Sequence, residues 1–156
     1  MDAINKIVIN GQETEPAYAP KRGLILMRRV DDLLYISGHG PEDAITNKPI
    51  YAGRVGEERT LEEGYAAARE CAVIILGAIR DIIGDLDKVK RLVKATGLVN
   101  CGEGFYDVDK VMDGFSDTMM AALDERGFHA RTVMGTRNLP NGNITVEIET
   151  IVQIET

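Results

Sequence analysis

The chain is poor in aromatic residues, cysteine and histidine. Among its 156 residues there is no tryptophan, and the three phenylalanines and five tyrosines are too few for a surface on which nucleic-acid bases stack. Two cysteines, Cys71 and Cys101, and two histidines, His39 and His129, show no metal-ligand spacing. We therefore expect reduced thiols and no bound metal.

Secretory and membrane-spanning segments are also lacking. The first ten residues, MDAINKIVIN, do not contain a charged region followed by an apolar region and a cleavage site. The longest apolar run is far shorter than the roughly 20 residues that span a bilayer. We expect a cytoplasmic protein with no membrane partner.

Acidic residues outnumber basic residues in the chain, 25 to 18. The formal net charge of −7 opposes binding to phosphate backbones, which requires lysine and arginine to displace counterions. The basic pairs Lys21-Arg22 and Arg28-Arg29 and the run 88–91 are local and contain no aromatic residues, so a solvated surface is the simpler interpretation. These observations argue against nucleic acid as a partner.

What is present is ordinary globular composition, with 44% hydrophobic and 28% charged residues. No repeat or low-complexity segment divides the chain, so we expect one domain over residues 1–156. Alternating or continuous apolar runs predict strands, and the pair Asp31-Asp32 predicts a hairpin turn between the second and third of them. The predicted strands are Lys6–Asn10, Leu24–Val30, Leu33–Ser37, Val89–Val99, Arg131–Arg137 and Ile144–Ile154.

Two helices are predicted between these strands. The first begins at a capping box, Thr60 to Glu63, and ends at Gly84. The second begins near Asp107 and ends at Gly127. Apolar residues recur at steps of three or four in both, so each buries one stripe. For the first helix this stripe is Leu61, Tyr65, Ala68, Ala72, Ile75, Ile79 and Ile83.

The resulting order, β-β-β-α-β-α-β-β, predicts an α/β (α+β) domain with a mixed sheet and both helices packed on one face. The strand–helix–strand unit from Val89 to Arg137 predicts a right-handed parallel crossover. The opposite face of the sheet needs cover, and an oligomer would provide it.

The most informative charges are Arg131 and Glu147, on the last two predicted strands. Glu147 lies within the apolar alternation of Ile144, Val146 and Ile148. A carboxylate there costs several kcal/mol unless it is paired, hydrogen-bonded or wet. From spacing alone, a buried ion pair or an exposed strand face is the more common explanation.

The sequence resembles the RidA/YjgF family, and most closely its subgroup described as putative endoribonuclease or chorismate-mutase-like. The similar stretches are Ser37-Gly-His-Gly-Pro41, GRVGEERTLEEGYAAAR (53–69), GDLDKVKRLVKATGLVN (84–100), and the ending formed by His129-Ala-Arg131, Leu139-Pro140 and Val146-Glu-Ile-Glu149. This resemblance implies a chorismate-mutase-like fold in which the final strand inserts between earlier strands. It also implies a homotrimer with three pockets between neighbouring subunits.

The family activity implied by the resemblance is hydrolysis of reactive imines or enamines to a 2-oxo acid and ammonia. Arg131 then grips the substrate carboxylate, because a guanidinium fork matches two carboxylate oxygens. Glu147 positions or activates the attacking water. Ser37 and Gly38 line the pocket, although alone they would indicate only a turn. His39 either hydrogen-bonds substrate or is a structural loop histidine.

The chain departs from the deaminase pattern at three positions. Leu24 replaces a tyrosine, Asp113 replaces an asparagine, and Val133 replaces a cysteine, with Asp113 and Val133 expected beside the substrate. Glu149 reads as a solvated or inter-subunit carboxylate. No cofactor is expected, because the C=N group is already an activated electrophile. The rival hypotheses are a non-catalytic trimer that binds small carboxylic acids and, least favoured, a ribonuclease.

Overall fold

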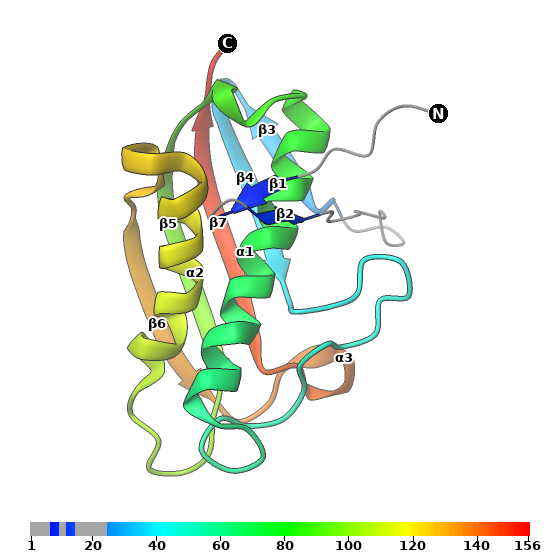
Figure 1. Ribbon diagram of the computed structural model, residues 1–156, viewed down its shortest axis with the longest axis vertical. Coiled ribbons are helices and arrows are strands. Elements are labelled where there is room, and N and C mark those ends of the chain that lie inside the picture. Colours follow the sequence, from blue (N-terminus) through cyan, green and yellow to red (C-terminus); the bar gives the residue numbers. More distant parts are fainter. Residues whose placement is uncertain (1–6, 10–11, 15–24) are drawn as a thin grey trace.

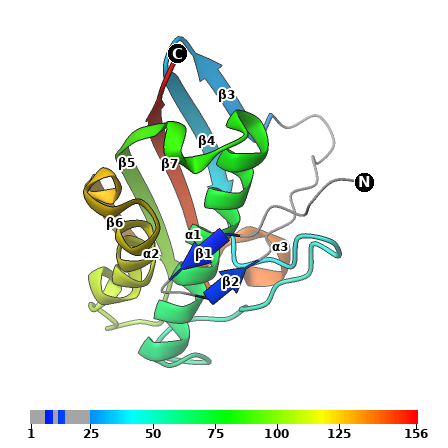
Figure 2. The same cartoon turned by 45° about the horizontal axis from the view of Figure 1, so that its top comes forward.

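A five-stranded sheet with two long helices on one face forms the body of the protein (Figures 1 and 2). The computed structural model describes residues 7–9, 12–14 and 25–156. Lys6, Asn10 and Leu24, at the ends of predicted strands, lie outside these residues. The strands of the sheet are β3 (Met27–Val30), β4 (Leu33–His39), β5 (Val89–Asn100), β6 (Ala130–Thr136) and β7 (Val146–Ile154).

The strand order in space is β3-β4-β7-β5-β6. The last strand of the chain, β7, therefore lies between β4 and β5 and pairs antiparallel with both, as the family resemblance predicted. Strands β5 and β6 are parallel, which confirms the parallel crossover through the second helix. The hairpin between β3 and β4 is also confirmed, and Asp31 in its turn has a positive φ of 54°. The fold class and the mixed sheet are as expected.

Helix α1 (Leu61–Ile83) begins and ends as its sequence predicts. The Thr60 hydroxyl accepts from the Glu63 amide at 3.2 Å, and the Glu63 carboxylate accepts from the Thr60 amide at 2.9 Å. At the other end Gly84 has φ 84°, a left-handed conformation that favours glycine. Such a reciprocal cap contributes about 1 kcal/mol to helix stability.

The predicted buried stripe of α1 is confirmed in the central turns of the helix. Near the start of the helix, Tyr65 departs from it. Ala68, Ala72, Ile75 and Ile79 are fully buried. Tyr65 instead leaves the core and donates its hydroxyl to the carboxylate of Asp117 at 2.8 Å. A tyrosine is suited to such a boundary because its ring packs while its hydroxyl remains polar.

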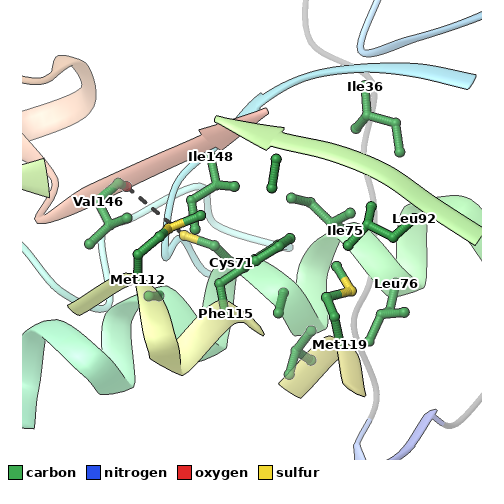
Figure 3. Packing of buried hydrophobic residues seen from close by; sticks show 14 of the residues in the cluster. Ile36, Cys71, Ile75, Leu76, Leu92, Met112, Phe115, Met119, Val146 and Ile148 are labelled. Atoms are coloured by element: carbon green, nitrogen blue, oxygen red, sulfur yellow. Dashed lines mark hydrogen bonds between the residues drawn. The ribbon is translucent and has the colours of Figure 1, made fainter. Parts of the chain in front are cut away.

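Helix α2 (Val108–Leu123) packs beside α1 on the same face and continues into a short 3-10 helix, η2 (Asp124–Gly127). Between the helices and the sheet lies one core (Figure 3). Helix side chains meet sheet side chains there, and Cys71 and Cys101 are both buried and free of disulfide bonds. Labelled members in Figure 3 include Ile75 and Leu76 from α1, Met112, Phe115 and Met119 from α2, and Ile36, Leu92, Val146 and Ile148 from the sheet.

Four short elements complete the described chain. Strands β1 (Ile7–Ile9) and β2 (Gln12–Thr14) form a separate antiparallel pair that crosses the helices on the side away from the main sheet (Figures 1 and 2). Strand β2 was not predicted. A 3-10 helix, η1 (Leu86–Lys88), precedes β5. The predicted turn at Leu139–Gly142 is found in the short element α3 (Pro140–Asn143), where Asn141 and Gly142 have positive φ angles of 46° and 72°.

The side chains of every second strand residue point to the sheet face away from the helices, which is here called the outer face. Tyr35 on β4 pairs with Ile151 on β7, and the neighbours of Tyr35, Leu34 and Ile36, are buried on the helix face. Tyr35 is 44% exposed, and Met134 on β6 is 48% exposed. These apolar side chains are the uncovered surface that the sequence predicted.

Within the described residues, no helix is long and apolar enough to cross a membrane.

Candidate functional site

Glu147 and the Ser37–Gly38 segment come together on the outer face. The flanking residues Val146 and Ile148 are fully buried on the helix face, so the alternation of β7 directs Glu147 outward. The β4–β7 register shifts between Ile36 and His39, an irregularity that includes Ser37 and Gly38. Gly38 then lies so close that a Cβ atom at this position would be 2.9 Å from the Glu147 Cδ. A larger residue at position 38 would have to displace the Glu147 side chain.

The surroundings of Glu147 favour its protonated form. Burial raises the pKa of its carboxyl above the usual glutamate value, and the negative charges of Glu42 and Glu149 add to the effect. The side chain is only half-buried, so water still reaches it. A carboxyl with a raised pKa that stays in contact with water is suited to accept a proton and return it during one reaction.

His39 lies on the other side of this irregular segment. It pairs with Ile148 of β7, and its side chain is 8% exposed, so it faces the helix side of the sheet. Its Nδ1 is 2.7 Å from the Ser37 carbonyl oxygen. This position matches the structural interpretation of a lone histidine, since the ring fixes the backbone of the segment that contacts Glu147.

Arg131 lies on the helix face of β6, the edge strand. Its Nη1 donates to the Asp113 carboxylate at 2.8 Å and to the Ser116 hydroxyl at 3.1 Å, and both acceptors belong to α2. Val133, two residues along β6, points the same way and packs against the core. Arg131 and Val133 therefore share the helix face of β6, and Asp113 of α2 contacts Arg131 there.

Within one chain, Arg131 and Glu147 do not meet. Strand β5 lies between β6 and β7, and the two side chains point to opposite faces of the sheet. A buried Arg131–Glu147 ion pair, the structural alternative raised by the sequence, is therefore wrong for the single chain. Among the described residues, Arg131 forms its ion pair with Asp113.

A hollow of about 400 Å³ opens on the outer face beside the Ser37 segment. Arg28 and Lys94 supply positive charge along its wall, and Glu149 supplies negative charge. The pair Arg28-Arg29 is interpreted from the sequence as a solvated surface, and Lys94 is not singled out. Simple alternation from the buried Leu92 would direct Lys94 to the helix face, but the β5–β7 register shifts between Leu92 and Lys94. The signal that could have placed Lys94 outward is its neighbour Ala95, which is fully buried on the helix face. The lining residues are Ile25, Arg28, Tyr35, Ile36, Ser37, Lys94, Thr96, Glu149, Thr150 and Ile151.

Comparison with known proteins decides the family. Residues 25–148 match the family described as YjgF/chorismate mutase-like, putative endoribonuclease. The chain belongs to this family. Protein TCP17 of Trypanosoma cruzi is 35% identical over 122 residues, which are 78% of this chain and 74% of that protein.

Solved structures of YjgF-like proteins have the same fold. Protein Atu1372 of Agrobacterium tumefaciens, of unknown function, is 33% identical with a TM-score of 0.82, over 88% of this chain and 86% of its own. A putative endoribonuclease of Shewanella oneidensis MR-1 is 24% identical, also with a TM-score of 0.82, over 89% of this chain and 91% of its own. At 24% identity, this second similarity concerns the fold alone.

Proposed function

We propose that this YjgF-family chain is an imine or enamine hydrolase that converts small carboxylate-bearing intermediates to a 2-oxo acid and ammonia. The observation that carries the proposal is the state of Glu147. Its half-buried carboxyl has a raised pKa and lies against the glycine of an irregular strand segment. These properties suit a group that takes a proton from water and later returns it to a leaving amine.

The reaction needs no oxidant or cofactor. Glu147 accepts a proton from water while the water oxygen bonds to the carbon of the C=N group, and the imine nitrogen takes up a proton from solvent. The resulting carbinolamine then loses ammonia: its hydroxyl proton passes to solvent, the C=O bond forms, and the protonated Glu147 gives its proton to the leaving nitrogen. An enamine enters the same sequence after a proton adds to its carbon.

Arg131 is the proposed carboxylate anchor, and its position requires a second subunit. Since Arg131 and Glu147 lie on opposite faces of one sheet, a pocket that uses both takes Glu147 from one copy and Arg131 from the β6 edge of another. A homotrimer with pockets between subunits supplies this arrangement. The apolar outer face and the edge position of β6 in the described sheet support such an assembly. The free, buried Cys71 and Cys101 suit a cytoplasmic location.

The test is an assay in which an imine is generated from an amino acid and formation of the 2-oxo acid is followed. Glu147→Gln keeps the shape and hydrogen-bonding capacity of the side chain but removes the base, so hydrolysis should fall by a factor of order 10² to 10⁴. Glu103→Gln, a change at a highly exposed carboxylate, is the matched control and should keep the parental rate. A parental rate in Glu147→Gln refutes the general-base role. Binding of 2-oxo acids without any hydrolysis by the parent favours a non-catalytic binding protein.

A further inference from the structure

Ser116 and His129 form a hydrogen-bonded pair on the helix face, away from Glu147. Ser116 lies in the middle of α2, and His129 lies just before β6. The Ser116 Oγ is 3.1 Å from the His129 Nε2. The other ring nitrogen, Nδ1, is 2.7 Å from the Gly127 carbonyl oxygen. A carbonyl can only accept, so Nδ1 carries the proton and Nε2 accepts from the serine hydroxyl.

The imidazole is held in this orientation from two directions. The ring of Phe115 meets it edge to face, at 5.7 Å between centroids and 87° between planes. Gly127, which supplies the carbonyl, is buried so tightly that an added Cβ would be 2.7 Å from the Met119 carbonyl carbon. Burial lowers the pKa of His129, the Gly127 carbonyl opposes this shift, and the charge of Arg131 adds to it. The ring is therefore neutral, and able to take a proton, at pH 7.

A third polar group faces the same serine oxygen. Arg131 Nη1 donates to Ser116 Oγ at 3.1 Å and to the Asp113 carboxylate at 2.8 Å. A guanidinium in this position stabilises negative charge on the serine oxygen and on any oxygen beside it. A hollow of about 250 Å³ opens over the group and is lined by Ser116, Met120, Phe128, His129 and Arg131. Met120 and Phe128 offer an apolar wall next to the polar atoms.

We propose that Ser116 and His129 form a second catalytic site, which transfers acyl groups from small activated esters through an acyl-serine. Nucleophile, oriented base and cation have the mutual geometry that this chemistry requires. His129 Nε2 takes the Ser116 proton as Oγ bonds to the ester carbonyl carbon. The tetrahedral oxyanion lies near Arg131. The alkoxide then leaves with the proton from His129, and the acyl group remains on Ser116.

The second half of the cycle restores the enzyme. Water gives a proton to His129 Nε2 and attacks the acyl carbon, and the carboxylic acid departs as Ser116 Oγ recovers the proton. Glu147 of the same chain takes no part, because it lies on the opposite face of the sheet. Both proposed sites include Arg131, so they border each other in the proposed trimer. Ser116→Ala and Glu147→Gln distinguish them, because each removes the reactive group of one site alone.

The full-length chain can be tested with two probes, an alkyl fluorophosphonate and p-nitrophenyl acetate. Labelling is measured as a mass increase on the intact protein and is mapped to a peptide. Ser37 and Ser116 are the two serines of the chain, so Ser37→Ala is a matched control for labelling. We expect one label on Ser116 in the parent, in Ser37→Ala and in Glu147→Gln, and none in Ser116→Ala. Alanine favours a helix, so Ser116→Ala should remain folded.

His129→Gln separates a base from a structural partner. Glutamine can still accept a hydrogen bond from Ser116 but cannot take its proton, so labelling and ester turnover should fall by about 10²-fold or more. An unlabelled parent overturns the proposal. Equal labelling of the parent and Ser116→Ala overturns it as well, and so does a parental labelling rate in His129→Gln.

Discussion

Gly38 and Glu147 are in contact across strands β4 and β7, and the carboxylate occupies the space that a side chain at position 38 would need. Gly38→Ala should therefore displace the Glu147 carboxylate. The backbone of Gly38 is not in the left-handed region, and the site is on the outer face, so the free energy of unfolding should change by about 1 kcal/mol or less. Imine hydrolysis should fall at least tenfold. Thermal melts and the coupled assay check both parts, and full activity in a folded Gly38→Ala variant would contradict the placement of the base.

The pH dependence of hydrolysis should report the environment of Glu147. A base acts when deprotonated, so the rate should fall as pH decreases through a pKa above the usual glutamate value. Glu149 contributes to this raised pKa. Glu149→Gln should therefore lower the pKa of Glu147 and extend activity to more acidic pH. A pH–rate profile of both proteins measures the shift. An identical acidic limb would assign it to another group.

Asp113 competes with any ligand of Arg131. Its carboxylate accepts from the Arg131 Nη1 at 2.8 Å, and both side chains are partly exposed, so the pair itself should contribute no more than about 1 kcal/mol to stability. Asp113→Asn removes the competing charge and should tighten the binding of 2-oxo acids several-fold, as measured by calorimetry. Arg131→Lys should bind them weakly, because a single ammonium cannot form the fork. Unchanged affinity in both variants would remove Arg131 from the carboxylate site.

Assembly should depend on the outer face. Ile151 lies there in the centre of the sheet, between the buried Thr150 and Val152. Ile151→Asp should convert the expected trimer to monomers in light scattering and abolish imine hydrolysis. Ile82→Asp is the control, because Ile82 is an exposed isoleucine of α1 and its substitution should leave the trimer intact. A parent that is monomeric at micromolar concentration would refute the inter-subunit pocket.

RNA should be neither bound nor cut at physiological salt. The net charge of −7 opposes phosphate binding, and the basic residues of the outer-face hollow are only Arg28 and Lys94 among the described lining. Gel shifts and cleavage assays with single-stranded RNA measure this directly. Cleavage that disappears in Arg131→Ala would instead support the ribonuclease activity that the family description suggests.

Local features of the fold could be predicted because nearby residues determine them. The capping box at Thr60 and the left-handed stop at Gly84 depend on a few consecutive positions. The place of β7 between β4 and β5 could not be derived from periodicity, because it depends on pairings far apart in the sequence. It came only from the family resemblance.

The candidate site shows the same division. Alternation correctly makes Glu147 the outward neighbour of two buried residues, but alternation within one strand does not say which face another strand offers. The sequence therefore did not show that Arg131 contacts α2 on the sheet face opposite Glu147. The contact between Ser116 and His129 was equally hidden, since the two residues are thirteen positions apart and the turn after α2 lies between them.

The central place of β7 also constrains how the molecule can be made. Without it, β3–β4 and β5–β6 are two separate pairs with no hydrogen bonds between them. A nascent chain on the ribosome cannot join these halves until residues through Ile154 have been synthesised and have emerged. Folding should then be late and cooperative, slowed by contacts of long sequence separation, with the edges of β4 and β5 exposed to chaperones until β7 arrives.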